Sequence, residues 1–157
     1  SSLALQPTSG EWVRTGQPDA ELTLLGAQVV VGDPTAGREL VEQRHGDTRP
    51  TDLVFLVVPV TVINERGSVS VTPMLRAGER SYEAWDGIRS LGTDPGFATQ
   101  RDLVFEIDPA DLTADLALEL TPGASLQLGR LVGRVVLPPP AVGAQVGYRQ
   151  SDTQWVP

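Results

Sequence analysis

The sequence predicts an all-β protein, with an immunoglobulin-like, two-sheet antiparallel β-sandwich of about seven to eight strands as the leading architecture. Apolar and polar residues alternate along most segments, as they do in strands that bury one face. The 157 residues include 16 Gly and 13 Pro, too many breakers for a helix bundle, and 40% are hydrophobic, too many for disorder. These breakers separate short alternating segments, which is typical of a sandwich. An up-and-down barrel is the alternative, because strand number does not separate the two.

The first half of the chain contains the predicted central strand. Glu21 to Gly32 predicts one strand with a bulge at Gly26, where the alternation changes phase. Asp33 to Thr51 is polar and interrupted by Gly and Pro, which predicts a long loop or an added hairpin. Asp52 to Asn64 is apolar on both faces in its first half, as expected of a core strand. Within it, Pro59 predicts a kink or a backbone nitrogen that faces an edge.

Two shorter strands follow the central one. They are Ser68 to Arg76 and Arg80 to Trp85, joined by a tight turn at Gly78. With Asp52 to Asn64 they are expected to form a three-stranded meander. Asp86 to Gln100 then predicts a crossing loop.

The strand Arg101 to Asp108 is predicted to point alternate side chains to opposite faces. Three side chains are expected to face inward: Leu103, Phe105 and Ile107. Val104 and Glu106 are expected to face outward. Asp108 followed by Pro109 is typical of a helix start and predicts a single helical turn.

The end of the chain contains the last two predicted strands and a proline-rich tail. The strands begin at Leu116 and at Leu126, and the second reaches Leu137. The tail begins as polyproline and is expected to be an extended arm lying on the domain or a disordered segment. The predicted organisation is therefore an N-terminal linker at 1–10 after a removed signal or anchor, a sandwich at 11–137, and a C-terminal arm at 138–157.

Composition excludes several kinds of site. The chain has no Cys and one His, so disulfides, thiolate nucleophiles and most transition-metal sites are excluded. Its net charge of −8 makes nucleic acid and anionic membranes unfavourable partners. We therefore expect no cofactor, no metal and no nucleic-acid partner, and contact with a membrane only through an N-terminal anchor outside this sequence.

Three stretches together resemble a known family. Val13 to Val30 resembles the first strand of small exported immunoglobulin-like, or telokin-like, domains of actinobacteria. Leu53 to Val69 resembles their core strand and turn, with Asn64 and Gly67 at matching places. In Asp94 to Leu120, the matching residues are Pro95-Gly96, Val104-Phe105-Glu106 and Asp108-Pro109.

The resemblance covers about residues 11 to 137 and consists of packing and turn residues. The family includes secreted antigens and anchored lipoproteins of unknown role. It implies an extracytoplasmic β-sandwich, secreted or anchored to the cell membrane, without an assigned catalytic site. Pro59 and the long segment Asp33 to Thr51 depart from the family pattern.

Aromatic side chains are the candidate binding residues: Trp12, Tyr82 and Trp85. Tyr82 and Trp85 are three residues apart, so on one strand they point to opposite faces and do not form one stacking platform. One of the two is therefore expected in the core, and Trp12 is expected to close one end of the sandwich.

Polar residues are weaker candidates for chemistry. His45 lies in a loop-like segment without a nucleophile-elbow pattern, so it is expected to be a solvated loop residue. Glu106 and Asp108 could act as the paired carboxylates of a hydrolase, but an outward polar face explains them more simply. A calcium site at Asp108, Asp111 and Asp115 has the right ligand type, but its spacing does not match an EF-hand loop.

The sequence therefore predicts a non-enzymatic domain of the cell envelope that recognises an envelope protein or a small ligand. One alternative is a hydrolase of envelope polysaccharide that uses Glu106. The other alternative is a structural spacer or assembly subunit. The identity of the partner and the oligomeric state do not follow from the sequence.

Overall fold

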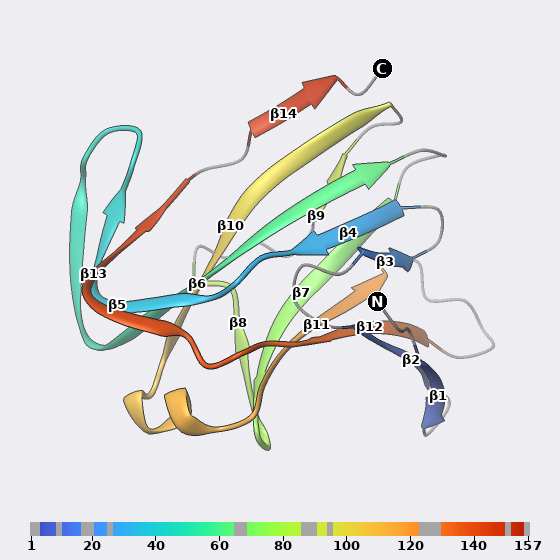
Figure 1. The fold of residues 1–157 in the computed structure, drawn as a ribbon, viewed down its shortest axis with the longest axis horizontal. Coiled ribbons are helices and arrows are strands. Elements are labelled where there is room, and N and C mark those ends of the chain that lie inside the picture. Colours follow the sequence, from blue (N-terminus) through green and yellow to red (C-terminus); the bar gives the residue numbers. More distant parts are fainter. Residues whose placement is uncertain are drawn as a thin grey trace.

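The protein is a two-sheet β-sandwich in the computed structural model (Figure 1), which confirms the predicted fold class. The described residues hold fourteen strands and one 3₁₀-helix. No helix among them is long and apolar enough to cross a membrane. The structure describes residues 4–8, 11–16, 21–24, 27–64, 69–85, 91–93, 96–122, 130–149 and 152–155.

The first sheet contains seven of the described strands. Its order is β1 (Ala4–Thr8), β2 (Glu11–Gly16), β12 (Arg130–Val136), β11 (Leu116–Pro122), β7 (Val69–Ala77) and β8 (Arg80–Glu83). β9 (Leu91–Thr93) pairs with β7.

The second sheet contains the other seven described strands. Its order is β13 (Ala141–Tyr148), β5 (Thr35–Glu42), β6 (Thr48–Asn64), β10 (Phe97–Ile107) and β14 (Asp152–Trp155). β4 (Ala27–Val31) pairs with β6, and β3 (Glu21–Leu24) pairs with β4. The pairs β2–β12 and β5–β13 are parallel, and the other pairs among the described strands are antiparallel. The expected purely antiparallel arrangement of seven to eight strands is therefore too simple.

The main core lies between the two sheets. β10 contributes the three side chains that the alternation placed inward, each with none of its surface exposed: Leu103, Phe105 and Ile107. From the first sheet, the same core receives Leu75, Leu118 and Val135, also without exposed surface. Burial of these apolar side chains is the main force that holds the sheets together.

β6 is the central strand of the second sheet, as predicted. It pairs with β10 along one side, and with β4 and then β5 along the other. Pro59 lies where β4 has ended and β5 has not begun, and its carbonyl accepts a hydrogen bond from the Gly32 N–H at 2.8 Å. Since N–H and C=O of a strand residue point to the same side, the missing donor of Pro59 faces this junction and leaves the β10 ladder intact.

Two predicted connections are wrong. β6 and β7 belong to different sheets, so the expected three-stranded meander does not form, although β7 and β8 do pair around Gly78, whose φ is +59°. Both sides of β6 are occupied, so β7 pairs instead with β11. Glu21 to Gly32 contains two antiparallel strands, with Leu24 opposite Ala27, and not one bulged strand. A phase change in the alternation marks a bulge or a chain reversal equally well, and Gly26 itself lies outside the described residues.

The polar segment Asp33 to Thr51 forms the added hairpin. β5 and the start of β6 pair as a hairpin whose register shifts between Gly37 and Glu39. Here β6 has four residues that have no register partner on β5, from Thr51 to Val54, so the sheet bends at a corner that Figure 1 shows at its left edge. A Cβ on Gly37 would lie 2.8 Å from the backbone carbonyl carbon of Gln145, so only glycine lets β13 pass this closely.

The bend brings the hairpin arm over the outer face of the second sheet and creates a second apolar cluster. We call it the outer cluster: Leu40, Phe55, Val57, Val104 and Val146, with Trp85 and Tyr148 packed against it. Val104 does face away from the main core, but it has none of its surface exposed. The expectation that this face of β10 is solvated is therefore wrong at Val104, because the arm covers it.

The proline-rich tail contributes strands to the second sheet. β13 follows β5 in parallel, and β14 pairs antiparallel with the start of β10. Between them, the Arg149 N–H donates to the Asp102 carboxylate at 2.8 Å, and the Asp102 N–H faces the Arg149 carbonyl at 3.4 Å. Burial raises the pKa of Asp102 even though the hydrogen bond from Arg149 acts in the opposite direction. The described residues of the tail, 138–149 and 152–155, therefore lie on the domain as an arm that pairs with the second sheet. Residues 4–8, expected within a linker, form β1.

Candidate functional site

Trp85 is the candidate binding residue that lies on the surface of the outer cluster. It follows β8 of the first sheet, and its N–H donates to the Val104 carbonyl of β10 in the second sheet at 2.7 Å. At this bond the chain passes from the first sheet to the second, and the indole packs against the outer cluster. The Trp85 ring meets Phe55 edge-on, with ring centroids 5.6 Å apart and an interplanar angle of 83°. This is one of the preferred geometries for aromatic pairs.

Arg49 lies over the Trp85 ring from the hairpin arm. The central carbon of its guanidinium is 5.0 Å from the ring centroid, within the range of a cation–π contact. Arg49 is exposed and Trp85 is half-buried. In the part of the chain that the structure describes, Arg49 forms no ion pair, so its N–H donors are available to another molecule.

The residues next to Arg49 fix the arm on the sheet. The Thr51 hydroxyl accepts a hydrogen bond from the Leu53 N–H at 3.0 Å and donates one to Glu106 Oε2 at 2.8 Å. The first bond closes a short turn within the register shift, and the second ties that turn to β10. The backbone next to Arg49 is therefore fixed to β10, which reduces the entropy that this segment would lose on binding a ligand.

The same contacts bear on the hydrolase alternative. Glu106 is occupied by Thr51, as just described. The other carboxylate of the predicted pair, Asp108, accepts the Ala110 N–H through Oδ1 at 2.9 Å, and its Oδ2 lies 3.5 Å from Arg80. Each of these carboxylates thus has a contact within the folded protein.

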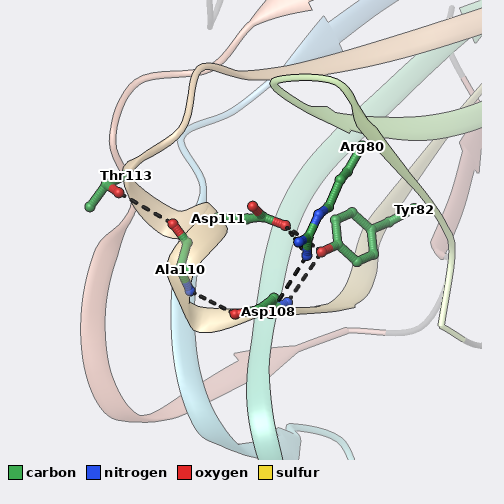
Figure 2. Close-up of polar contacts among 6 residues, drawn as sticks. All are labelled: Arg80, Tyr82, Asp108, Ala110, Asp111 and Thr113. Atoms are coloured by element: carbon green, nitrogen blue, oxygen red, sulfur yellow. Dashed lines mark hydrogen bonds and ion pairs between the residues drawn. The ribbon is translucent and has the colours of Figure 1, made fainter.

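Tyr82 belongs to a different place in the fold. Its ring packs against the main core, and its hydroxyl donates to Asp111 Oδ2 and accepts the Asp108 N–H at 3.3 Å (Figure 2). Arg80 lies 3.5 Å from both carboxylates. Tyr82 and Trp85 therefore contact two different clusters, as their spacing predicts, and Tyr82 is the one that belongs with the core.

The acidic residues of the calcium hypothesis lie in and beside the 3₁₀-helix Pro109–Thr113. Asp108 caps it as predicted, with its side chain on the Ala110 N–H. Asp111 contacts Tyr82 and Arg80, and the Asp115 carbonyl accepts the Gly78 N–H at 3.0 Å. A hydrogen bond with Tyr82 and the charges of Asp111 and Asp108 raise the pKa of Arg80. Within the described ranges, no group of three His, Cys, Asp or Glu side chains is placed to hold a metal ion.

Glu42 is the buried acidic residue at the tip of the hairpin arm. It is 5% exposed, and its carboxylate accepts the N–H groups of Arg44 at 3.0 Å and His45 at 2.7 Å. His45 Nδ1 lies 2.9 Å from the same carboxylate. Burial raises the pKa of Glu42, but the hydrogen bonds from the two backbone N–H groups and the imidazole outweigh it, and the pKa lies below its ordinary value. His45 is exposed, as predicted, but it has a structural partner.

This arrangement predicts that acid loosens the tip of the arm. Because the pKa of Glu42 is lower in the folded protein, its contribution to stability is full above the ordinary carboxyl pKa of 4.5 and disappears as the pH falls through the lower folded value. The protection of the Arg44, His45 and Gly46 amides against hydrogen exchange, relative to their intrinsic exchange rates at each pH, should therefore fall in that pH range. Glu42→Gln should show fast exchange at these amides at neutral pH already, whereas the control Glu79→Gln, in the exposed turn after β7, should behave like the wild type. Unchanged protection in Glu42→Gln would contradict this role.

The remaining candidate, Trp12, lies in β2, between β1 and β12. Its side chain is outside the described part of the structure, so the prediction that it closes one end of the sandwich stays a prediction. Sequence reasoning did not single out Arg49, Phe55 or Thr51 as site residues. Arg49 and Thr51 lie in a segment that resembles a loop, and their approach to Trp85 and Glu106 depends on the register shift between Gly37 and Glu39.

Comparison with known proteins yields one structural similarity to report. No protein-family model and no curated protein matches the chain. Among solved structures, the chain is similar to an uncharacterized β-sandwich protein from Clostridium difficile 630, with 9% sequence identity and a TM-score of 0.47. The match covers 74% of this chain and 90% of that chain. The specific resemblance to exported actinobacterial domains stays a prediction.

Proposed function

We propose that this chain is a non-enzymatic recognition domain of the cell envelope that binds an envelope protein or a small ligand through Trp85 and Arg49. The observation that supports this proposal is the exposed Arg49 guanidinium over the half-buried Trp85 indole, held on the covered face of a sheet. Trp and Arg are the side chains that most often dominate binding energy at protein interfaces. Here they are adjacent and already oriented.

The chemistry of the pair suggests what kind of ligand it takes. The guanidinium offers paired N–H donors to a carboxylate, and the part of the indole that Arg49 leaves uncovered offers an apolar surface to a sugar ring or an apolar peptide side chain. The edge-on contact with the buried Phe55 helps to fix the position of the indole. A sugar or peptide that carries a carboxylate would use both groups at once, even though the chain as a whole is acidic.

The first experiment is a titration followed by isothermal calorimetry, because a fluorescence signal from Trp85 would be lost in Trp85→Ala whether or not the probe binds. The probes are a uronic-acid oligosaccharide, its neutral counterpart, a short peptide with a free C-terminal carboxylate, and the same peptide as an amide. We expect a carboxylate probe to bind, and Trp85→Ala and Arg49→Ala each to weaken binding by about tenfold or more, which corresponds to about 1.4 kcal/mol. The matched control Arg38→Ala removes an exposed arginine from β5 and should bind like the wild type.

Two outcomes would overturn this site. One is binding that Trp85→Ala and Arg49→Ala leave unchanged. The other is hydrolysis of the oligosaccharide probe that disappears in Glu106→Ala, which would support the enzyme alternative instead.

The proposed location outside the cytoplasm rests on the resemblance of three sequence stretches to exported actinobacterial domains. It is tested by expressing the full-length gene in its own host and separating cytoplasm, envelope and culture medium. The protein should be found in the envelope or the medium. Recovery in the cytoplasmic fraction alone would contradict this part of the proposal.

A further inference from the structure

β13 lies at the end of the second sheet, and only one of its sides is paired among the described residues. It is hydrogen-bonded to β5, and no other described strand lies beyond it (Figure 1). An open strand edge presents a row of unpaired N–H and C=O groups that favours pairing with a further strand. Proteins usually protect such edges with charge, with proline, or by making them short.

The other five strands that pair on one side only among the described residues have such protection. β8 carries Arg80 and Glu83, β1 contains Pro7, and β3 begins with Glu21. β9 has only three residues, and β14 has only four and begins with Asp152. β13 has eight residues and contains neither a charged residue nor a proline. It is therefore the unprotected edge among the described ends of the sheets.

The strand at this edge and the residues that precede it are also free of charge, and the neighbouring Glu39 carboxylate of β5 accepts a hydrogen bond from the Gln145 side-chain amide. Residues 135–148 form the longest run without Asp, Glu, Lys or Arg in a chain whose residues are 20% charged. Residues 141–145 are nevertheless all exposed, and Val142 is 65% exposed, the highest value among the exposed large hydrophobic side chains of the described residues. A burial pattern without alternation indicates that solvent reaches this part of the strand from both faces.

We propose that β13 pairs with β13 of a second copy of this chain, antiparallel about a twofold axis, so that the two second sheets become one continuous sheet. Twofold dimers are the commonest assemblies, and their interfaces are self-complementary. In any antiparallel self-pairing of 141–145, each residue lies opposite one from the same uncharged set, so no like charges face each other across the pair. The small side chains of Ala141, Gly143 and Ala144 leave room for the second strand.

The charge of the whole chain distinguishes a second copy from an oppositely charged partner strand by its dependence on salt. Each copy carries −8, so two copies repel each other at long range, and salt screens that repulsion over about 8 Å at physiological ionic strength. Dimerisation through an uncharged edge should therefore become stronger as salt is added. Association with an oppositely charged partner strand would become weaker.

The test is sedimentation of the purified chain over a wide range of concentration, at low and at physiological salt. Wild type should increase from 16.8 kDa towards twice that mass, more readily at the higher salt. Val142→Glu places two carboxylates close together across the axis and should stay at the monomer mass. The matched control Val136→Glu makes the same change at a 41% exposed position in the first sheet and should dimerise like the wild type.

Amide hydrogen exchange of the wild type locates the contact without any mutation. The amides of 141–145 should become protected as concentration rises, and those of β8 should not. Wild type that stays monomeric at every concentration would overturn the inference, as would protection elsewhere or a folded Val142→Glu that dimerises normally. The inference does not rest on the proposed ligand site: a monomer that binds a probe through Trp85 would contradict only the dimer, and a dimer without binding would contradict only the site.

Discussion

Replacement of Phe105 with alanine is expected to lower the free energy of unfolding by about 3–5 kcal/mol, as for other large aromatic residues in cores. Phe105 has none of its surface exposed and lies between the two sheets, opposite Leu56 of β6 in the register. Alanine would leave a cavity that surrounding strands, hydrogen-bonded on both sides, close only in part. Since domains of this size are stable by about 5–15 kcal/mol, the variant should lose a large fraction of its stability.

Urea unfolding followed by circular dichroism measures this loss. Phe105→Leu is the matched control, because it keeps most of the apolar volume, and it should lose about 1 kcal/mol. A change below that value in Phe105→Ala would mean that the two sheets do not pack around this side chain.

Val104→Asp is expected to be destabilising by about 3 kcal/mol or more, because it places a carboxylate without a partner in an apolar cluster. Val104 is adjacent to Phe105 and faces the other side of the sheet, yet it too has none of its surface exposed. The hairpin arm, Trp85 and Val146 account for this burial. The substitution therefore tests whether the arm covers the sheet in solution.

The control for Val104→Asp is Val136→Asp, which makes the same change where 41% of the side chain is exposed. It should change stability by no more than about 0.5 kcal/mol. If Val104→Asp were as mild as the control, the outer face of β10 would be solvated, as its position in the alternation suggests, and the outer cluster would not exist.

The alternation of β10 shows what the sequence could predict and what it could not. Its period places Leu103, Phe105 and Ile107 on one face, and all three lie in the main core. The same period says only that Val104 and Glu106 share the opposite face. Whether solvent reaches that face depends on residues that are distant in the sequence. The register shift between Gly37 and Glu39 brings the hairpin arm, which contains some of these residues, over the face.

Predictions that depend on residues adjacent in sequence were correct, whereas the prediction of which strands pair with each other was not. The 3₁₀-helix after Asp108 needs only a capping side chain and a proline, which are adjacent in sequence, and it was predicted correctly. The pairing of β6 and β7 was predicted from their proximity in sequence and is wrong, because β4, β5 and β10 occupy both sides of β6. A segment without alternation can still form a strand, as β13 does when it follows β5.

For the candidate site, the sequence identified the aromatic residue but not the groups that surround it. The three-residue spacing of Tyr82 and Trp85 correctly separated the two rings. The signal for Arg49 was absent, because an arginine in a polar segment is typical of any exposed loop. Its position over the Trp85 ring comes from the folded arm and is visible only in three dimensions.

The most direct test of recognition through Trp85 and Arg49 is nuclear magnetic resonance of the isotope-labelled chain during titration with the carboxylate probes. We predict that the largest shifts occur at the indole Nε1–H of Trp85 and the guanidinium Nε–H of Arg49, and that they saturate as probe is added. Saturable shifts centred on Tyr82 and Asp111, with Trp85 and Arg49 unmoved, would contradict the proposal.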